Sequence, residues 1–451
     1  MKKTTNNNLS DSWTISPLSK VIIALESGSR PKGGVKHITD GIPSLGAEHL
    51  DKNGTFDLTN IRYVPEDFAI RMTRGSIRKG DILVVKDGAT TGKTSLVRES
   101  FPYKRAVINE HVFLCRCNED VIPDYIFYYL FSSNGNQSIL KDFRGAAQGG
   151  ISQRFADLVM VPLAPIDEQK LIVSEIEKQF SRLDEAVAAL KRVRASLKRY
   201  KASVLKAAVE GKLTEEWRKR RGEVASPFFE TNKLRKGGET PPLQKQGAEL
   251  PEGWVCAKLD EVAEINPKLP KNIPDNVEVS FLPMKLVQEE TGVIDLSITK
   301  KFGEVKRGYT SFINNDIIFA KITPCMENGK IAIVENLKNG LGFGSTEFHV
   351  IRLHELKSNK YLFYFLLQRD IRKQAQRNMT GTAGQLRVPA KFMQEISVSL
   401  PPISEQLKIV EEIESRLSVA EEIEETIDIN LTRAERLRQA ILKKAFSGRL
   451  I

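Results

Sequence analysis

Two long stretches of the chain share one pattern of apolar and polar positions. Residues 167–211 and 404–448 carry apolar side chains at spacings of three, four and seven, which predicts one long amphipathic helix in each. The second stretch repeats the first in constant register, so that Leu205, for example, recurs as Leu442. The chain is therefore an internal repeat built around a duplicated helix.

The ends of both helices are marked in the sequence. Asp167 and Ser404 are residue types that cap helix N-termini, and Gly211 and Gly448 suit the left-handed position that ends a helix. At 1.5 Å per residue each helix is roughly 65 Å long. A helix of that length with one apolar side needs a partner along it, and its copy is the obvious one.

Charge favours an antiparallel pair. Residues 191–201 are rich in lysine and arginine, and residues 421–428 are rich in glutamate. Pairing the helices antiparallel about their midpoints sets 191–201 against the mostly acidic segment 415–425, whereas parallel pairing sets it against further arginines. The alternative is that the charges merely solvate two unrelated helix faces.

Before each long helix the sequence predicts a domain of mixed structure, and the two domains have the same order of elements. GDILVVKDGATTGKTSLV (residues 80–97) reads as strand, loop, strand, and NDIIFAKITPCMENGKIAIV (315–334) matches it. HVFLCRC is a predicted strand, and DYIFYYLFSS a predicted helix that returns as NKYLFYFLLQ. Glycine loops, RGAAQGGIS and GTAGQLRV, follow in both halves. The segment after Gly211 lacks apolar periodicity and reads as a linker, partly ordered near Trp217.

The expected fold class is α+β, with two tandem domains of mixed α/β structure joined by two long helices in an antiparallel coiled coil. Five segments follow: a first domain over 1–165, a first long helix over 166–213, a linker over 214–250, a second domain over 251–402 and a second long helix over 403–451.

Composition adds a partner class and a compartment. The 451 residues carry a net charge of +11, with a pI near 9.3, which favours a polyanionic partner. Four cysteines without zinc spacing or a disulfide framework indicate reduced thiols. The sequence has no run long enough to span a bilayer, and MKKTTNNNLS lacks the apolar core of a signal peptide, so we expect a cytoplasmic protein.

Catalytic patterns are scarce. Gly88 to Thr94 resembles a phosphate-binding loop, but only three residues separate its glycines where four are needed, and no helix is predicted after it. We interpret it as a turn between strands. His111 and His349 lie in strand-like segments and read as core histidines. We expect no catalytic residue, no metal and no cofactor.

The duplicated loops are the best candidates for contact with double-stranded DNA. Lysines that end strands beside glycine can approach phosphates, and arginine and glutamine can read base edges with two hydrogen bonds. The alternative for each is a solvated surface charge. The predicted DNA-binding residues are Lys86, Lys93, Gln148, Arg154, Lys321, Lys330, Arg377, Gln385 and Arg387.

Taken together, the chain resembles the specificity subunit of type I restriction-modification systems. The features that carry the resemblance are the two Pro-x-x-Glu-Gln motifs that open the long helices at Pro165 and Pro402, the matching helix exits LKAAVEGKLTEEW and LKKAFSGRL, and the tandem divergent domains.

The resemblance implies two target recognition domains, each reading one half of a split, asymmetric DNA sequence. It also implies that the helices act as a spacer and carry two modification (methyltransferase) subunits, that ATP-dependent restriction subunits join the assembly, and that adenine methylation or DNA cleavage is performed by these partners. Two other interpretations stay open: a DNA-processing enzyme with an unrecognised catalytic site, and a coiled-coil scaffold. The target sequence, the spacer length and the domain that reads each half are not encoded in any pattern visible here.

Overall fold

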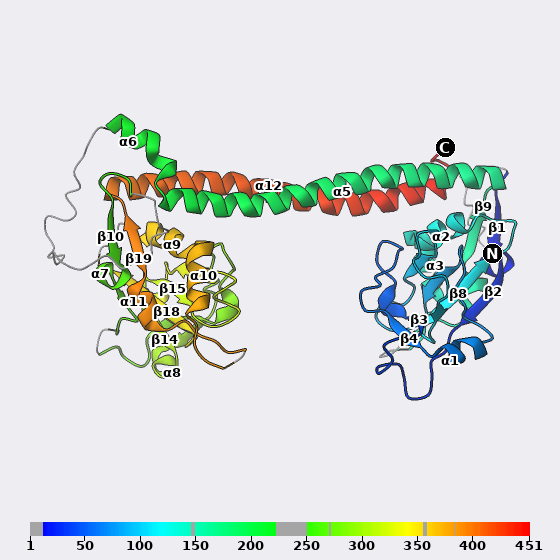
Figure 1. Cartoon of the computed structure of the whole chain (residues 1–451), viewed down its shortest axis with the longest axis horizontal. Helices are drawn as coiled ribbons and strands as arrows, with labels where there is room; N and C mark the ends of the chain where they lie inside the picture. The colour runs from blue at the N-terminus through cyan, green and yellow to red at the C-terminus, as the bar shows by residue number, and fades with distance from the viewer. Residues whose placement is uncertain (1–11, 146–148, 222–249, 270–271, 355–358, 383) are drawn as a thin grey trace. The chain divides into compact units, whose positions relative to one another are not determined.

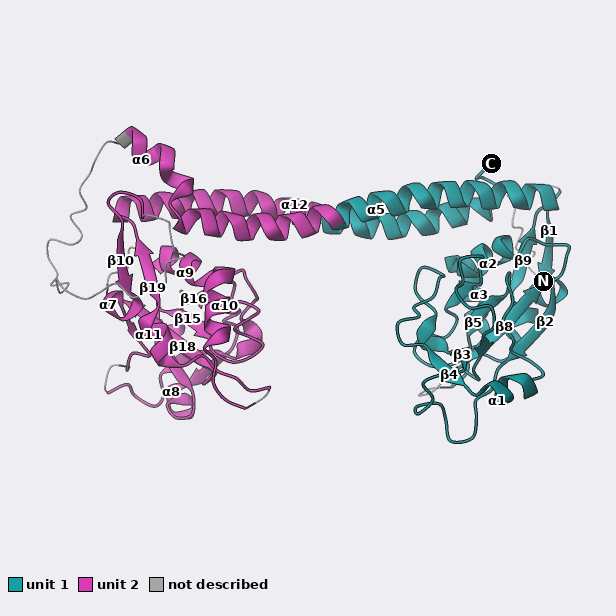
Figure 2. Cartoon of the chain, viewed as in Figure 1, with its two compact units in different colours: residues 1–191, 427–451 teal, residues 192–426 magenta. Residues whose placement is uncertain are grey.

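A computed structural model describes residues 12–145, 149–221, 250–269, 272–354, 359–382 and 384–451 (Figure 1). The chain forms two compact units (Figure 2). Unit 1 is made of two segments of the chain, and unit 2 is made of one. Unit 1 contains residues 1–191 and 427–451, and unit 2 contains residues 192–426. Among the described residues, no helix is both long and apolar enough to cross a membrane.

Unit 1 is built on an antiparallel four-stranded sheet in the order β2-β8-β5-β6. Its strands are β2 (Ile22–Ser27), β8 (Val112–Cys117), β5 (Ile82–Val85) and β6 (Thr94–Leu96). A smaller sheet pairs β3 (Ile42–Leu45) with β4 (Arg62–Val64) and, in parallel, with β7 (Val107–Ile108). The ribbon β1 (Thr14–Pro17) and β9 (Met160–Leu163) leads into the long helix. The short helices are α1 (Glu66–Arg71), α2 (Pro123–Phe131), α3 (Ser133–Ile139) and α4 (Phe155–Leu158).

Unit 2 repeats this topology with one added strand. Its main sheet has the order β11-β18-β15-β16, which matches β2-β8-β5-β6 one for one. These strands are β11 (Ala263–Ile265), β18 (Phe348–Leu353), β15 (Ile317–Ala320) and β16 (Ile331–Ile333). The second sheet joins β13 (Thr299–Lys301), β12 (Glu278–Leu282), β17 (Leu341–Gly344) and the extra β14 (Thr310–Ile313). The ribbon is β10 (Val255–Lys258) and β19 (Ser397–Leu400), and the short helices are α6 (Glu215–Arg221), α7 (Leu259–Val262), α8 (Phe302–Val305), α9 (Asn359–Leu367), α10 (Arg369–Arg377) and α11 (Ala390–Glu395).

The two long helices, α5 (Ile166–Val209) and α12 (Ile403–Ala445), pair within each unit. In unit 1, Ile172 and Ile176 near the start of α5 share a buried cluster with Leu442 near the end of α12. In unit 2, Val204 near the end of α5 shares one with Ile409 near the start of α12. The start of each helix thus packs on the end of the other, which confirms the antiparallel coiled coil.

The apolar seam of α12 follows a seven-residue repeat, as coiled-coil packing requires. Its most regular buried positions are Ile413, Ala420, Ile427, Ala434 and Ile441. The ion pair of Lys201 with Glu424, at 2.6 Å, lies within the two segments that the charge pattern set against each other, 191–201 and 415–425, although midpoint pairing placed residue 415 and not Glu424 opposite Lys201. Burial of the apolar seam contributes more to stability than such an ion pair does.

The predicted helix ends are half right. Gly211 and Gly448 have φ angles of 70° and 68°, the left-handed conformation expected of glycines that end helices. The predicted N-caps at Asp167 and Ser404 are wrong, because both helices begin one residue earlier, directly after Pro165 and Pro402. The carbonyl of each proline accepts the first hydrogen bond of its helix. Asp167 lies in the first turn of α5, where its negative charge interacts favourably with the helix dipole.

The strand predictions over 80–97 are confirmed as β5 and β6. The residues between them form a tight hairpin in which Gly88 and Gly92 both have positive φ. Thr91 donates its hydroxyl hydrogen to the Gly88 carbonyl at 2.7 Å. Since a strand and not a helix follows, the loop lacks the helix N-terminus that a phosphate-binding loop uses.

Candidate nucleic-acid interface

The end of β5 in unit 1 is a meeting point of several short stretches, which we call the first junction: residues 86–88, 109–111, 144–145 and 149–151. Lys86 donates its backbone N–H to the His111 carbonyl, and Ile151 donates to the Lys86 carbonyl, both at 2.8 Å. Arg144 and Gly150 exchange two backbone hydrogen bonds and so close the glycine loop into a hairpin.

Unit 2 forms the same arrangement at the end of β15, the second junction, from residues 321–323, 345–347, 380–382 and 384–388. Lys321 donates to the Glu347 carbonyl at 2.9 Å, and Val388 donates to the Lys321 carbonyl at 2.8 Å. Thr380 and Arg387 exchange two bonds of 2.9 Å. Lys86 and Lys321 therefore occupy equivalent positions, as their place in the two strands predicted.

The first junction carries a chain of charged side chains. His111 Nδ1 lies 2.6 Å from Asp87 Oδ1, and its Nε2 lies 3.5 Å from Glu110 Oε1. Arg30 reaches the same Glu110 oxygen at 2.6 Å from the loop after β2. Within the described residues, Glu110 Oε2 is buried without a hydrogen-bond partner. Acceptor groups thus dominate the centre of this junction.

The second junction places an arginine where the first has none. Arg387 donates from Nε and Nη2 to the Glu347 carboxylate, at 2.9 and 2.8 Å for the shortest bond of each nitrogen. The hydrogen bonds and the charge of Arg387 lower the pKa of Glu347 and outweigh the opposing effect of its burial. Glu347 therefore stays ionised and keeps the guanidinium in place.

The buried imidazole of His349 holds the hairpin of unit 2 through a hydrogen bond. His349 Nε2 lies 2.8 Å from the Val388 carbonyl, and its Nδ1 lies 3.2 Å from Asn266 Nδ2. Burial lowers the pKa of His349, and the charge of Lys321 acts in the same direction. The sequence-based interpretation of His349 as a core histidine is consistent with this burial.

The hairpin of unit 1 is fastened by a carboxylate. Asp142 Oδ2 accepts the backbone N–H of Ser152 at 2.7 Å and its hydroxyl at 2.6 Å. Burial acts to raise the pKa of Asp142, but these bonds and the charges of Arg144 and Arg154 lower it below its usual value. Both hairpins are thus held by a buried polar group, although the two groups are chemically different.

Two of the nine predicted DNA-binding residues bind backbone instead. Lys93 donates from Nζ to the Leu50 carbonyl at 2.9 Å, and Lys330 donates to the Met284 carbonyl at 3.2 Å. These equivalent contacts tie a strand to a neighbouring loop in each unit. A role of Lys93 and Lys330 in DNA binding stays a prediction, and each ammonium has fewer N–H donors left for DNA because one binds a carbonyl.

The other predicted residues divide by exposure. Arg154, Arg377 and Gln385 are exposed, and Lys321 and Arg387 are partly so. Lys86 is half-buried; its ammonium lies 3.4 Å from the Glu110 carbonyl and 5.6 Å from the centre of the Phe113 ring. Gln148 lies outside the described residues. The first junction brings Lys86 together with the hairpin of unit 1. The second junction, within unit 2, brings together Lys321, Gln385 and Arg387.

Sequence reasoning missed the loop after β2. Arg30, Lys32 and Lys36 are exposed there, and the contact of Arg30 with Glu110 attaches the loop to the first junction. The available signal was its composition, in which three cations stand close to the adjacent glycines Gly33 and Gly34. The partners Asp87, Glu110 and Glu347 were also missed, because only the fold brings them beside the cations.

The Pro-x-x-Glu-Gln motifs have a structural explanation. Glu168 accepts the Trp13 indole N–H at 2.9 Å in unit 1, and Glu405 accepts the Trp254 indole N–H at 3.0 Å in unit 2. The glutamine that follows each glutamate donates to the carbonyl of the segment before the helix, at 2.9 and 2.8 Å. Each motif therefore fixes its domain to the start of a long helix.

Glu405 has two additional partners. The Thr214 hydroxyl donates to it at 2.6 Å, and Arg218 of α6 forms an ion pair with it. Glu405 is almost fully buried. A buried carboxylate of this kind needs such donors, because an unpaired buried charge is costly.

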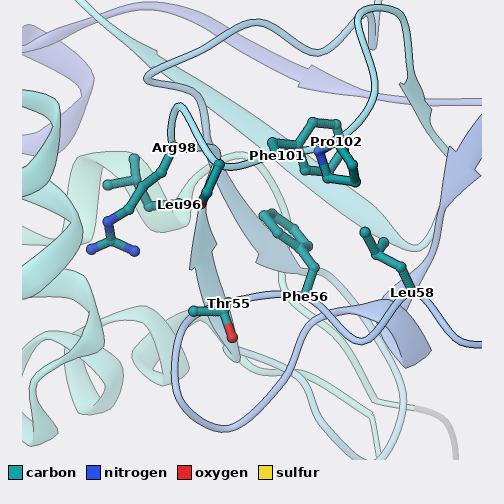
Figure 3. Close-up of a pocket in the computed structure, with 8 residues that line it drawn as sticks. Thr55, Phe56, Leu58, Leu96, Arg98, Phe101 and Pro102 are labelled. Carbon is teal, nitrogen blue, oxygen red and sulfur yellow. The ribbon is translucent and has the colours of Figure 1, made fainter.

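Unit 1 contains a small cavity lined in part by Phe56 and Phe101 (Figure 3). Its volume is about 150 Å³, and the rings of these two residues pack edge to face, with centroids 5.3 Å apart. Arg98 at its edge contacts Asp124 and Tyr128. The space is too small for a nucleotide, and in the described part of the chain no group of three or more His, Cys, Asp or Glu residues is placed to hold a metal ion.

Comparison with known proteins assigns similarity to one group. The profile of the type I restriction modification DNA specificity domain matches residues 251–433. The chain is 36% identical to the EcoAI specificity subunit of Escherichia coli over 53% of this chain and 42% of that protein, so this match spans less than half of the relative's length. It is 25% identical to the StySPI specificity subunit of Salmonella potsdam over 98% of this chain and 90% of that protein.

Solved structures share the fold along the whole chain. A chain from a study of complex assembly and conformational transition of the type I R-M system superposes with a TM-score of 0.68 at 16% identity, over 98% of this chain and 99% of that one. The HsdS subunit from Thermoanaerobacter tengcongensis gives a TM-score of 0.53 at 18% identity, with 98% of both chains covered.

Proposed function

We propose that this chain, a member of the family of type I restriction-modification specificity subunits, reads a bipartite, asymmetric DNA sequence and directs partner subunits to it. One observation carries the proposal: the two junctions share a backbone arrangement and differ in their side chains. A conserved arrangement with different donors and acceptors is what two readers of different half-sequences require.

The reading surface in the proposal consists of the two junctions and the loops attached to them. Phosphate contacts come from exposed cations, with Lys321 and Arg154 as the predicted residues nearest the hairpins, joined by Arg30, Lys32 and Lys36. Base contacts come from Gln385, Arg387 and the acceptors of the first junction. The net charge of +11 supports binding to a polyanion.

The partners in the proposal are two modification subunits, which methylate adenine, and restriction subunits, which cleave DNA. The EcoAI and StySPI relatives are named as specificity subunits of type I restriction enzymes. The chain itself then contributes recognition in the cytoplasm without catalysis or a cofactor of its own, and its long helices serve as spacer and as partner-binding surface.

The decisive experiment tests whether the chain co-purifies with any modification subunit encoded beside it, and then maps adenine methylation across the genome in cells with and without this gene. We expect one bipartite methylated motif to disappear on deletion. Unchanged methylation, with the chain purifying alone, would refute the proposal.

Independent reading by the two domains has its own test. Replacing residues 14–160 by the same region of a relative changes only one half of the motif if each domain reads alone. A change in both halves contradicts independent reading, and it is visible in the same methylation map.

A further inference from the structure

The second junction holds an arginine whose donors are only partly used. A guanidinium has five N–H donors. In the described part of the chain, Arg387 commits Nε and one hydrogen of Nη2 to Glu347, and one hydrogen of Nη1 to the Gln385 carbonyl at 3.0 Å. One N–H on each terminal nitrogen remains, and 41% of the side chain is exposed.

Glu347 fixes the plane of the guanidinium and the direction of one of these donors. It takes the edge formed by Nε and Nη2, so the remaining hydrogen of Nη2 lies on the other side of that nitrogen, facing Nη1, which keeps one hydrogen of its own. Two parallel donors match the acceptors O6 and N7, which guanine alone presents side by side in the major groove.

We propose, on the basis of the proposed function, that Arg387 reads a guanine in the half-site of unit 2 and that Glu347 is the positioning residue that holds the guanidinium for it. Glu347 does not touch DNA in this arrangement. Its role is to remove the rotational freedom of a long side chain before binding, which reduces the entropy lost on contact.

The first junction has no counterpart of Arg387 at the equivalent position. Gly150 occupies it, since both residues close their hairpin and precede the residue that binds the strand-end lysine. A Cβ at Gly150 would lie 2.8 Å from the Lys86 carbonyl oxygen and 2.9 Å from Asp87 Cβ, so a side chain there requires these neighbours to shift. The proposal for Arg387 therefore concerns the half-site of unit 2 alone.

A phosphate contact is the competing role for Arg387. It predicts a different result, because phosphates carry no sequence information and their loss weakens binding to all sequences alike. Guanine reading predicts lost discrimination at one base pair, and a good bidentate pair supplies roughly 5- to 150-fold of it.

The experiment expresses the full chain with its modification subunit and compares methylation maps of the wild type, Arg387→Lys and the control Arg220→Lys. Arg220 is an exposed arginine of α6 paired with Glu216. We expect Arg387→Lys to make a single G·C position of one half-site degenerate, with the other half and the control unchanged. A wild-type map without a motif that depends on this gene refutes the proposed function; a wild-type motif that Arg387→Lys leaves intact refutes only the guanine proposal.

The positioning role of Glu347 is tested by asking which base pair of the methylated motif its variants affect. We expect Glu347→Ala to relax the same G·C position as Arg387→Lys, and Glu347→Asp, which keeps a carboxylate for the pair, to retain most of the preference. A uniform fall in methylation at every site, without a change in base preference, indicates a phosphate contact or a folding defect and overturns the proposal.

Discussion

At the scale of single residues, the chain relies on buried charges that recur in both halves. Asp81 and Asp316 each accept two hydrogen bonds from an arginine on the neighbouring strand of the main sheet, Arg116 and Arg352 respectively, at 2.7 and 2.8 Å. Removing one member of such a pair leaves the other charge uncompensated. These pairs fix the main sheet in each unit and do not belong to the reading surface.

The carboxylates at the starts of the long helices give a matched pair of variants. We expect Glu405→Gln to reduce the free energy of unfolding of unit 2 by about 2–3 kcal/mol, because Trp254, Thr214 and Arg218 all donate to this carboxylate. Glu168→Gln in unit 1, where the recorded donor is Trp13, should cost about 1 kcal/mol. Hydrogen exchange in urea, read from peptides of each unit, measures both; equal effects would contradict the prediction.

His349 predicts a loss of hairpin stability in acid. Burial holds its pKa in the folded chain below the ordinary 6.5, so near and below pH 6.5 the unfolded chain binds a proton that the folded chain does not. Stability therefore falls as the pH drops through 6.5 towards the folded pKa.

The measurement is hydrogen exchange of residues 380–388 at pH 7.5 and 5.5, corrected for the intrinsic exchange rate. We expect faster opening at pH 5.5 in the wild type and a weaker pH effect in His349→Gln. An equal pH effect in both chains would show that His349 is not its source. The hairpin of unit 1, held by Asp142, is the internal control.

The residue scale is also where sequence prediction was weakest. Lysines at strand ends beside glycine were reasonable candidates for phosphate contact, yet Lys93 and Lys330 point to backbone carbonyls. The sequence cannot show which loop packs over a strand end. Arg387 was correctly chosen as a residue type that reads bases, but its partner Glu347 lies forty residues away in the chain and only the fold joins them.

At the scale of elements, periodicity predicted most of the structure. The long helices, the hairpin of β5 and β6 and the aromatic helix α2 all follow from local spacing, because each buries one face against a neighbour. The helix starts were missed by one residue, since both helices begin directly after a proline, whose carbonyl accepts the ordinary first helical hydrogen bond. The charge pattern predicted which segments of the two helices face each other, and the ion pair of Lys201 with Glu424 lies within them.

The seam of the long helices contains a polar layer that can be tested. Lys201 and Glu424 form an ion pair of 2.6 Å in unit 2, with side chains 27% and 31% exposed. Replacing a partly buried pair by apolar residues is often neutral or stabilising. We expect the double variant Lys201→Leu and Glu424→Leu to gain about 1 kcal/mol, and Lys201→Leu alone to lose stability, because it leaves Glu424 unpaired.

Thermal unfolding of the four chains of this double-mutant cycle measures the coupling between the two residues. A double variant less stable than either single variant would mean that the ion pair itself stabilises the seam. An unchanged melting temperature in all four chains would mean that the pair is fully screened by solvent.

At the scale of the whole molecule, the proposed spacer makes a length prediction. Inserting one helical turn of four residues at matching positions in α5 and α12 adds about 6 Å, close to two base pairs of DNA. We expect the methylated motif to gain one or two base pairs of spacer while both half-sequences stay the same. An unchanged spacer would refute the role of the helices as a ruler, and insertion into one helix only should abolish methylation by disrupting the seam.

Unit 1 is assembled from two segments that lie far apart in the sequence, and this affects its folding during synthesis on the ribosome. Its core is completed by Leu442, Ala445 and Phe446, and Phe446 packs edge to face on Tyr125 and Tyr129. Residues 192–426 must be translated before that segment emerges, which takes roughly 10–50 s at bacterial or slower elongation rates. During this interval the surface of Tyr125 and Tyr129 that Phe446 covers in the folded unit stays exposed on the nascent first domain. A prematurely terminated chain never covers that surface, so it is more susceptible to proteolysis than the complete chain.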